Sequence, residues 1–218
     1  PARSWWERLQ ATAMAIEVPP AAAPWRDEGG DAFDLPRLPA APPGEPGDAG
    51  AGGDADAETR AAALGRAVHR LLEWIGQPGP AALPRPRWPS AAAQAASAFG
   101  LDKSGADEVL KLASRIADSP ECRRFFAGPA LRWAGAEVPV AWAGESLRID
   151  RLVQLDESEG PAWWVLDYKL AHRPEALQPL REQLARYRDA VQQAQHAAGD
   201  RRPVHAAFVT GQGHLVPL

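Results

Sequence analysis

The sequence predicts an α/β fold in which helices flank a mixed central sheet, with accessory helices beside it. Two segments, residues 58–75 and 174–198, carry apolar side chains at helical spacing. Between them lie three stretches with the alternation or the dense apolar run of β-strands, at residues 130–142, 147–155 and 162–169. Further strand patterns occur at residues 204–210 and 214–216. The predicted core order is therefore helix, three strands, helix and strand.

The N-terminal quarter of the chain differs in composition from the rest. Residues 1–18 are predicted to form a short amphipathic helix. Residues 19–57 are rich in proline, alanine, glycine and acidic side chains, so they bury too little apolar surface to fold and are interpreted as a linker. One folded domain is expected over residues 58–218. Because the sequence begins at Pro1 rather than methionine, we expect it to be part of a longer protein.

Charge and cysteine content restrict the setting in which this protein works. The net charge is −4, and residues 26–60 contain nine acidic and three basic side chains, so the remainder is slightly basic. Affinity for nucleic acid grows with the number of phosphates neutralised, so weak binding by the isolated domain is expected. The single cysteine, Cys122, permits no intrachain disulfide, which fits a reducing, cytoplasmic compartment. No apolar run is long enough to span a membrane.

His69 lies at the edge of the apolar stripe of the first helix, four residues after Gly65. A glycine inside a helix costs roughly 1 kcal/mol relative to alanine. It is tolerated where the helix approaches another backbone or a ligand closely. Taken alone, a histidine beside an apolar stripe is more often a packed core residue than a ligand.

The segment between the first helix and the first strand is predicted to add accessory helices without visible chemistry. A proline-rich connection at residues 77–90 precedes helical patterns at residues 90–99 and 104–118. The sequence Ser-Pro-Glu starting at Ser119 predicts a further short helix through Phe126.

The first strand places Val138 and Val140 on one face and Glu137 and Pro139 on the other. The proline indicates an edge position or a strand end, because it cannot donate to a sheet ladder.

The second and third strands are expected to form a hairpin around the polar segment 156–161. If the hairpin is symmetric about this segment, Asp150 lies directly opposite Asp167, with Cβ atoms roughly 5 Å apart. Like charges so placed repel each other. A divalent cation between them would remove the repulsion, because hard cations take carboxylate oxygens as ligands.

Lys169 is expected on the same strand face as Asp167, roughly 6.6 Å along the strand, whereas Tyr168 points into the core on the opposite face. Two carboxylates and an amine on one face can bind a metal ion, orient a water and stabilise charge on a phosphate. The alternative is an ordinary Asp–Lys pair at an exposed strand end. The apolar run from Trp163 to Leu166 favours the functional interpretation, because it marks this strand as central and buried.

These motifs resemble those of PD-(D/E)XK nucleases, and most closely the branch at the C-terminus of RecB- and AddA-type helicase–nucleases. ID at residues 149–150 and VLDYK at residues 165–169 resemble the core motif. GRAVH, residues 65–69, is similar to the upstream G-x-x-x-H helix, and QLARY, residues 183–187, is similar to the downstream Q-x-x-x-Y helix. Relatives often carry a glycine just before the I-D step, as in G-x-I-D, whereas this chain has Leu147 and Arg148 there and its nearest glycine is Gly144.

The resemblance implies a restriction-endonuclease-like αβββαβ core and a Mg²⁺-dependent DNA nuclease, for which Mn²⁺ can substitute. The implied metal ligands are Asp150, Asp167, His69 and the backbone carbonyl of Tyr168. Lys169 would position or activate the attacking water and stabilise charge on the phosphate. Gln183 and Tyr187 would orient the site and the DNA strand.

The resemblance also indicates secondary candidates. Glu137 matches a glutamate that several members carry before an apolar–proline step, and it is either structural or near the metal. Arg148 at the rim of the site, with Arg181 and Arg186 in the later helix, are candidate contacts to DNA phosphates.

The resemblance implies an exonuclease that processes double-strand breaks in the bacterial cytoplasm, at the nucleoid. Its partners would be a helicase domain in the same parent chain and a second helicase–nuclease subunit. Two other classes remain open, because a fold does not fix a function. One is a catalytically weak nuclease-fold module used for DNA binding or partner docking. The other is a hydrolase that uses a carboxylate metal site on a substrate other than nucleic acid.

Overall fold

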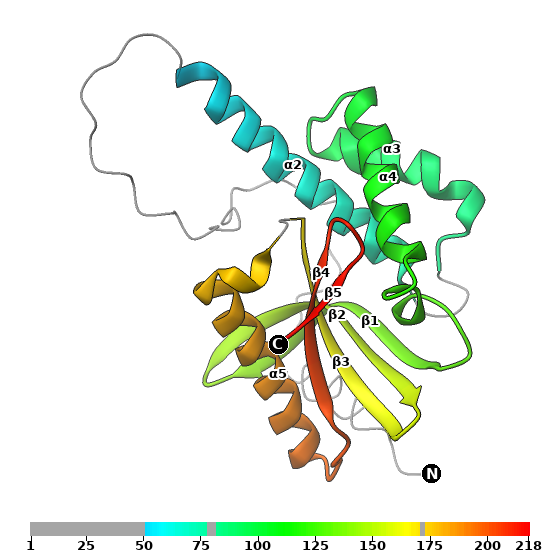
Figure 1. Ribbon diagram of the computed structural model, residues 1–218, viewed down its shortest axis with the longest axis vertical. Helices are drawn as coiled ribbons and strands as arrows, with labels where there is room; N and C mark the ends of the chain where they lie inside the picture. Colours follow the sequence, from blue (N-terminus) through cyan, green and yellow to red (C-terminus); the bar gives the residue numbers. More distant parts are fainter. Residues whose placement is uncertain (1–50, 78–81, 171–172) are drawn as a thin grey trace, which may run out of the picture. The chain divides into compact units, whose positions relative to one another are not determined.

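The computed structural model describes residues 51–77, 82–170 and 173–218 (Figure 1). The predicted N-terminal helix, and the predicted linker as far as residue 50, lie outside the described residues. Helix α2 spans Ala51–Ile75. It therefore ends where the sequence predicts, but it begins before the predicted start at residue 58. Its buried stripe agrees with the predicted helical spacing and includes Val68, Leu71, Leu72 and Ile75.

Two accessory helices and two 3-10 turns follow α2. They are η2 (Arg85–Arg87), α3 (Trp88–Ala98), α4 (Lys103–Asp118) and η3 (Arg123–Phe125). Asp102 is the N-cap of α4, since its Oδ1 accepts a hydrogen bond from the N–H of Gly105 at 2.8 Å. The prediction of a short helix from Ser119 through Phe126 is wrong, because only the single turn η3 forms there. The Ser119 hydroxyl accepts from the N–H of Cys122 at 3.0 Å, and this contact stabilises a turn instead.

Five strands form one mixed sheet in the order β1-β2-β3-β4-β5. They are β1 (Leu131–Trp142), β2 (Glu145–Glu157), β3 (Gly160–Lys169), β4 (Val204–Thr210) and β5 (Leu215–Pro217). Strands β3 and β4 are parallel, and the other neighbouring pairs are antiparallel. The crossover between the parallel strands contains the turn η4 (Pro174–Ala176) and helix α5 (Gln178–Ala197). This arrangement confirms the predicted α/β restriction-endonuclease-like fold.

The register of the β2–β3 hairpin is the symmetric one that the sequence predicts. Arg151 pairs with Leu166 at one end, and Glu157 pairs with Gly160 at the other. The turn is shorter than the predicted loop at 156–161, because the strands extend to Glu157 and from Gly160. Gly160 has φ of 117°, a conformation that favours glycine over residues with a side chain.

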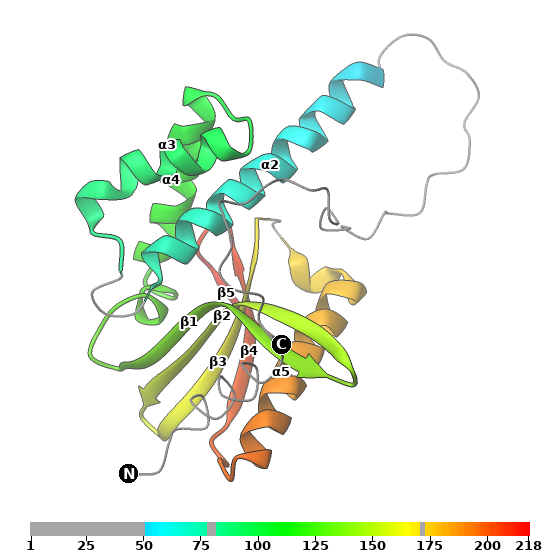
Figure 2. The ribbon, with the colours of Figure 1, turned by 180° about the vertical axis from the view of Figure 1, so that it is seen from behind.

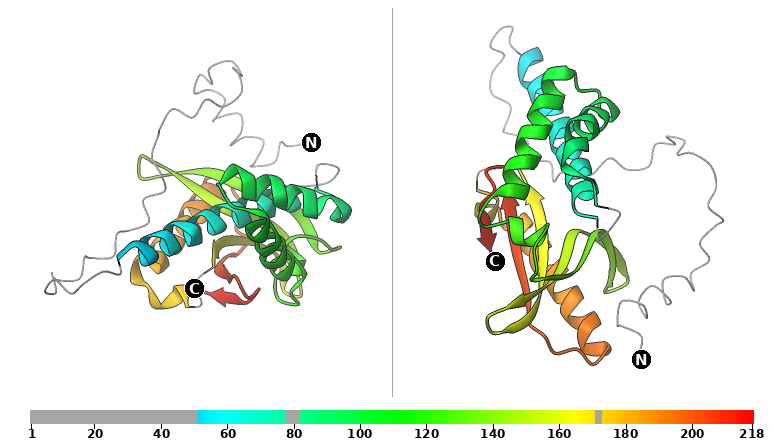
Figure 3. Two further views of the ribbon diagram at one scale, coloured as in Figure 1. Left: turned by 90° about the horizontal axis from the view of Figure 1, so that it is seen from above. Right: turned by 90° about the vertical axis from the view of Figure 1, so that its right-hand side faces the viewer.

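The two faces of the sheet pack against different helices. Leu166, Tyr168 and Ala207 belong to the core cluster that includes residues of α2, α3 and α4. Residues of the opposite parity, such as Val165 and Phe208, point to the other face, where α5 packs along β4 (Figures 1 and 2). The right-hand view of Figure 3 shows α2, α3 and α4 (cyan to green) grouped together, away from α5 (orange).

No helix among the described residues combines the length and the apolar character needed to cross a lipid bilayer.

Candidate metal centre and active site

The candidate site lies where β2 and β3 separate, beyond Arg151 on β2 and Leu166 on β3. This point is called the fork below. The last ladder pair of the two strands is Arg151 with Leu166. Asp150 and Asp167 occupy the next position on each strand, as the symmetric register requires. Beyond this pair, the backbone N–H of Tyr168 on β3 donates to a side chain of β2, the Oδ2 of Asp150, at 2.8 Å. The fork therefore turns the Asp150 carboxylate toward the backbone of Tyr168.

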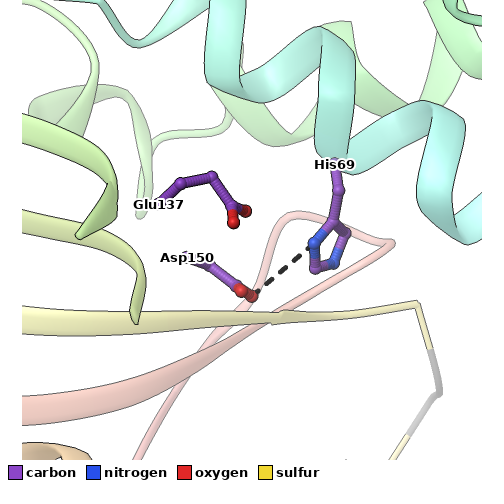
Figure 4. Close-up of side chains that lie close together, drawn as sticks. All are labelled: His69, Glu137 and Asp150. Carbon is purple, nitrogen blue, oxygen red and sulfur yellow. Dashed lines mark ion pairs between the residues drawn. The ribbon is translucent and has the colours of Figure 1, made fainter. Parts of the chain in front are cut away.

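His69 reaches the same point from helix α2 (Figure 4). Its Nε2 lies 3.0 Å from the carbonyl oxygen of Tyr168, to which it can donate a hydrogen bond. Its Nδ1 lies 3.7 Å from Oδ2 of Asp150, and its ring meets the Tyr168 ring edge-on, with 5.4 Å between centroids. The histidine of the G-x-x-x-H segment is thus half-buried in the site rather than packed wholly in the core.

Glu137 enters the site from β1. The ladder pairs on either side of it place it across from Asp150. Its φ is 51°, a left-handed conformation that costs an ordinary L-residue about 1–2 kcal/mol. One ligand atom from each of His69, Glu137 and Asp150 lies within 4.8 Å of the others, and Figure 4 shows the three side chains converging. Burial, and next the charge of Asp150, raise the pKa of Glu137 above its usual range.

Asp167 and Lys169 form the second half of the site. Lys169 Nζ lies 2.7 Å from Oδ2 of Asp167, and the Asp167 side chain is only 4% exposed. Burial and the neighbouring charge of Asp150 raise the pKa of Asp167 to about 6, although Lys169 acts in the opposite direction. Asp167 stays outside the group of His69, Glu137 and Asp150, and its nearest charged partner is the lysine.

Gln183 and Tyr187 lie one turn apart on α5. Gln183 Nε2 donates to the Tyr187 hydroxyl at 2.8 Å. Burial, followed by the charge of Asp167, raises the pKa of Tyr187 to about 12, so its phenol remains protonated at neutral pH. Because the hydroxyl accepts from Gln183, its own hydrogen is free to point toward another acceptor near the acids.

The three arginines proposed to contact phosphates lie in different surroundings. Arg148 is exposed and forms an ion pair with Glu137 at 3.4 Å, which places it beside the metal-ligand candidates. Arg181 donates to the backbone carbonyl of Glu175, at the start of α5. Arg186 is exposed on α5, and its charge opposes the rise in the pKa of Tyr187.

The donor set fits a hard divalent cation. Two carboxylates, Glu137 and Asp150, converge with His69, and Asp167 lies opposite Asp150 on β3. Burial, and next the charge of Asp150, raise the pKa of both Glu137 and Asp167. Oxygen ligands with one imidazole suit Mg²⁺ or Mn²⁺, and bound positive charge would offset the repulsion among the acids. The Tyr168 carbonyl oxygen also points into this group, where His69 contacts it.

Sequence reasoning did not single out Glu73, which lies four residues after His69 on α2. It forms an ion pair with Arg70 at 3.0 Å, and its charge contributes to the raised pKa of Glu137. The helical spacing from His69 was the signal that could have indicated it.

Comparison with known protein families agrees with this geometry. Residues 48–214 match the family model described as the PD-(D/E)XK nuclease superfamily. No individual curated protein matches the chain significantly. Members of this superfamily are generally metal-dependent nucleases, and the matched range contains the whole fork and both flanking helices. The chain therefore belongs to the PD-(D/E)XK nuclease superfamily.

Proposed function

We propose that this protein is a Mg²⁺-dependent DNA nuclease that hydrolyses phosphodiester bonds at the fork between β2 and β3. The observation that carries the proposal is the position of Lys169. Its ammonium group lies 2.7 Å from Asp167, which the hairpin register places opposite Asp150, one of the three residues with converging ligand atoms. A set of ligand atoms that can bind a cation, together with the Lys169 ammonium group, suits the binding and cleavage of a phosphodiester.

The residues that would hold the ion are Asp150, Asp167, Glu137, His69 and the carbonyl oxygen of Tyr168. When bound, such an ion polarises the phosphate and makes a bound water more acidic. The Tyr168 carbonyl oxygen has two lone pairs, so it could act as a ligand while it accepts from His69.

Lys169 would orient the attacking water and stabilise the negative charge that develops on the phosphate. The Asp167 carboxylate would hold the ammonium group in place for this task. Tyr187 remains a hydrogen-bond donor at neutral pH, and Gln183 fixes the direction of its hydroxyl. These two residues of α5 would therefore orient an acid or a phosphate oxygen at the edge of the site.

We also propose that the domain acts as an exonuclease within a helicase–nuclease of double-strand-break repair, with a second helicase–nuclease subunit, in the bacterial cytoplasm. The motif likeness of residues 65–69 and 183–187 to the RecB- and AddA-type branch supports this assignment. The weakly basic charge of the domain supports it too, because a helicase would deliver the strand at high effective concentration.

The proposal is tested by incubating the 218-residue chain with three substrates. They are linear single-stranded DNA, linear duplex DNA and a simple phosphodiester that is not a nucleic acid. Each substrate is offered with Mg²⁺, with Mn²⁺ and with EDTA. We expect slow DNA cleavage that requires the ion. A matched control is Lys103→Met, at the exposed start of α4, which should cleave like the unchanged chain.

Other outcomes identify the other classes. Binding of DNA without cleavage under any ion would contradict nuclease activity and favour a binding module. Cleavage of the simple ester but not of DNA would favour a hydrolase with a different substrate.

A further inference from the structure

Arg151 is a fully buried charged residue that follows Asp150 directly on β2. By strand alternation its side chain points to the face opposite Asp150. None of the acidic residues in the described part of the chain forms an ion pair with it. Burying a guanidinium is costly unless its donors are satisfied, so the position of this side chain needs a specific explanation.

The guanidinium is satisfied by two backbone carbonyls from different elements. Nη1 donates to the carbonyl of Gly76 at 2.8 Å, immediately after α2. Nε and Nη2 donate to the carbonyl of Phe125 at 2.9 Å and 2.6 Å, at the end of η3. The Phe126 ring lies 4.7 Å from the guanidinium carbon. Arg151 therefore joins β2, the C-terminal end of α2 and η3.

Gly76 is required for this contact. A Cβ at residue 76 would lie 2.0 Å from Nη1 of Arg151, so any side chain there displaces the guanidinium. The Gly76 N–H continues the α2 hydrogen-bond pattern by donating to Leu72 at 2.8 Å. The carbonyl that Arg151 contacts is thus at the negative end of the α2 dipole, where a cation is favoured.

The same arginine lies at the fork of the candidate site. It forms the last ladder pair with β3, and the next residue on β2 toward the site is Asp150. Two helical turns before Gly76, α2 carries His69, whose ring contacts the Tyr168 carbonyl and Asp150. Apolar packing of α2 is not directional, whereas these hydrogen bonds are. They therefore fix where α2 stands along the fork.

We propose that Arg151 is a positioning residue that sets the place of His69 over Asp150 and the Tyr168 carbonyl, and so strengthens divalent-cation binding. The inference rests on the proposed metal-dependent function. It concerns cation binding through one ligand, and it assigns Arg151 no contact with substrate or ion.

The test is a double-mutant cycle on the 218-residue chain, with the dissociation constant for Mn²⁺ measured by titration calorimetry. Arg151→Met should weaken Mn²⁺ binding about tenfold, the lower range for residues that orient metal ligands. In a His69→Ala background the same change should alter Mn²⁺ affinity less than about twofold, since the ligand that Arg151 positions is already absent. Arg151→Lys should recover part of the affinity, because an ammonium can reach only one of the two carbonyls.

Two further variants keep the test independent of folding defects. Gly76→Ala retains the arginine but displaces its guanidinium, so it should lower Mn²⁺ affinity in the same direction. Arg124→Met removes a neighbouring arginine that pairs with Glu157 and stacks on Phe125, without touching α2, and should leave Mn²⁺ affinity unchanged.

The possible failures are distinguishable. If Arg151→Met weakens Mn²⁺ binding equally with and without His69, Arg151 does not act through His69 and the inference is overturned. If the unchanged chain binds no Mn²⁺, the proposed function itself fails, whatever the variants do.

Discussion

Asp150 connects the candidate site to the protein backbone. Its Oδ2 accepts from the Tyr168 N–H and lies 3.7 Å from His69. Burial, and next the charge of Asp150, raise the pKa of both Glu137 and Asp167. One carboxylate therefore fixes the fork and makes its neighbours costly to ionise, which is the electrostatic condition that a bound cation relieves.

Asp167 provides a prediction on pH dependence. Its folded pKa, about 6, lies above the ordinary value of 3.8, so ionisation of Asp167 destabilises the metal-free protein as pH rises through about 6. Asp167→Asn should therefore raise metal-free stability at pH 8 by up to about 3 kcal/mol, less the lost contact with Lys169. This gain should disappear below about pH 4.

Thermal unfolding in EDTA from pH 4 to pH 8 measures this effect. Asp156→Asn, at an exposed ion pair near the other end of β2, is the control and should show no such gain with rising pH. A gain in stability that grows as pH falls would contradict the assigned direction of the Asp167 pKa shift.

Asp167→Asn should also abolish metal-dependent cleavage, because it removes a proposed ligand.

Lys169 is predicted to act on the rate and not on metal affinity. Lys169→Met should reduce DNA cleavage about 10²-fold or more, the usual range for a group that assists proton transfer or stabilises charge. Calorimetric titration should give a Mn²⁺ dissociation constant equal to or lower than that of the unchanged chain, since a repelling cation is removed. Loss of Mn²⁺ affinity together with the rate would show that the roles of Lys169 and the carboxylates are not separate.

At the scale of elements, the candidate metal ligands and Lys169 come from one helix and three strands, and α5 adds Gln183 and Tyr187. Strand β1 contributes Glu137 through a local left-handed residue, β2 contributes Asp150, β3 contributes Asp167 and Lys169, and α2 contributes His69. Non-glycine residues in strained conformations are often retained where they direct a functional side chain. Glu137, with its positive φ, is such a position.

Two substitutions at Glu137 separate strain from ligation. Glu137→Gly and Glu137→Gln both remove the carboxylate, so both should weaken Mn²⁺ binding to a similar extent. Only the glycine relieves the left-handed strain, so it should be more stable than the glutamine variant by roughly 0.5–1 kcal/mol in EDTA. The comparison uses calorimetry and chemical denaturation. Equal stability of the two variants would argue against backbone strain at this residue.

At the scale of the whole molecule, charge is the limiting property. The chain carries a net charge of −4, with its acidic excess concentrated in residues 26–60. Several arginines of the domain are already engaged with acids, including Arg124, Arg132, Arg148 and Arg202. The acids beside these arginines offset part of the attraction between the domain and DNA phosphates.

The isolated chain is predicted to bind DNA weakly and with a shallow salt dependence. We expect log–log plots of the association constant against salt concentration with a slope of magnitude below about 3, since the slope follows the number of phosphates neutralised. Fluorescence anisotropy with labelled single strands measures it. Arg186→Gln should reduce the slope further, and Arg202→Gln, at an ion pair with Asp200, is the control. Tight binding at physiological salt would contradict the need for a delivering partner.

The sequence alone determined the features that depend on neighbouring residues along the chain. The alternation of β3 separates Tyr168 from Asp167 and Lys169, and the turn chemistry near Gly160 gave the β2–β3 register. Helical spacing predicted the stripe of α2, and the spacing of four residues places Gln183 and Tyr187 on one face of α5. These features follow from periods of 2 and 3.6 residues and from local turns, so no distant contact was needed to predict them.

Only the tertiary structure decided which distant groups meet. It placed Glu137, rather than Asp167, beside His69 and Asp150, because the conformation at Glu137 and the β1–β2 register together direct that side chain. It joined Arg151 to carbonyls 26 and 75 residues away in the chain. Side-chain patterns contain no signal for such contacts, because a buried cation can be satisfied by any backbone carbonyl that the packing brings near.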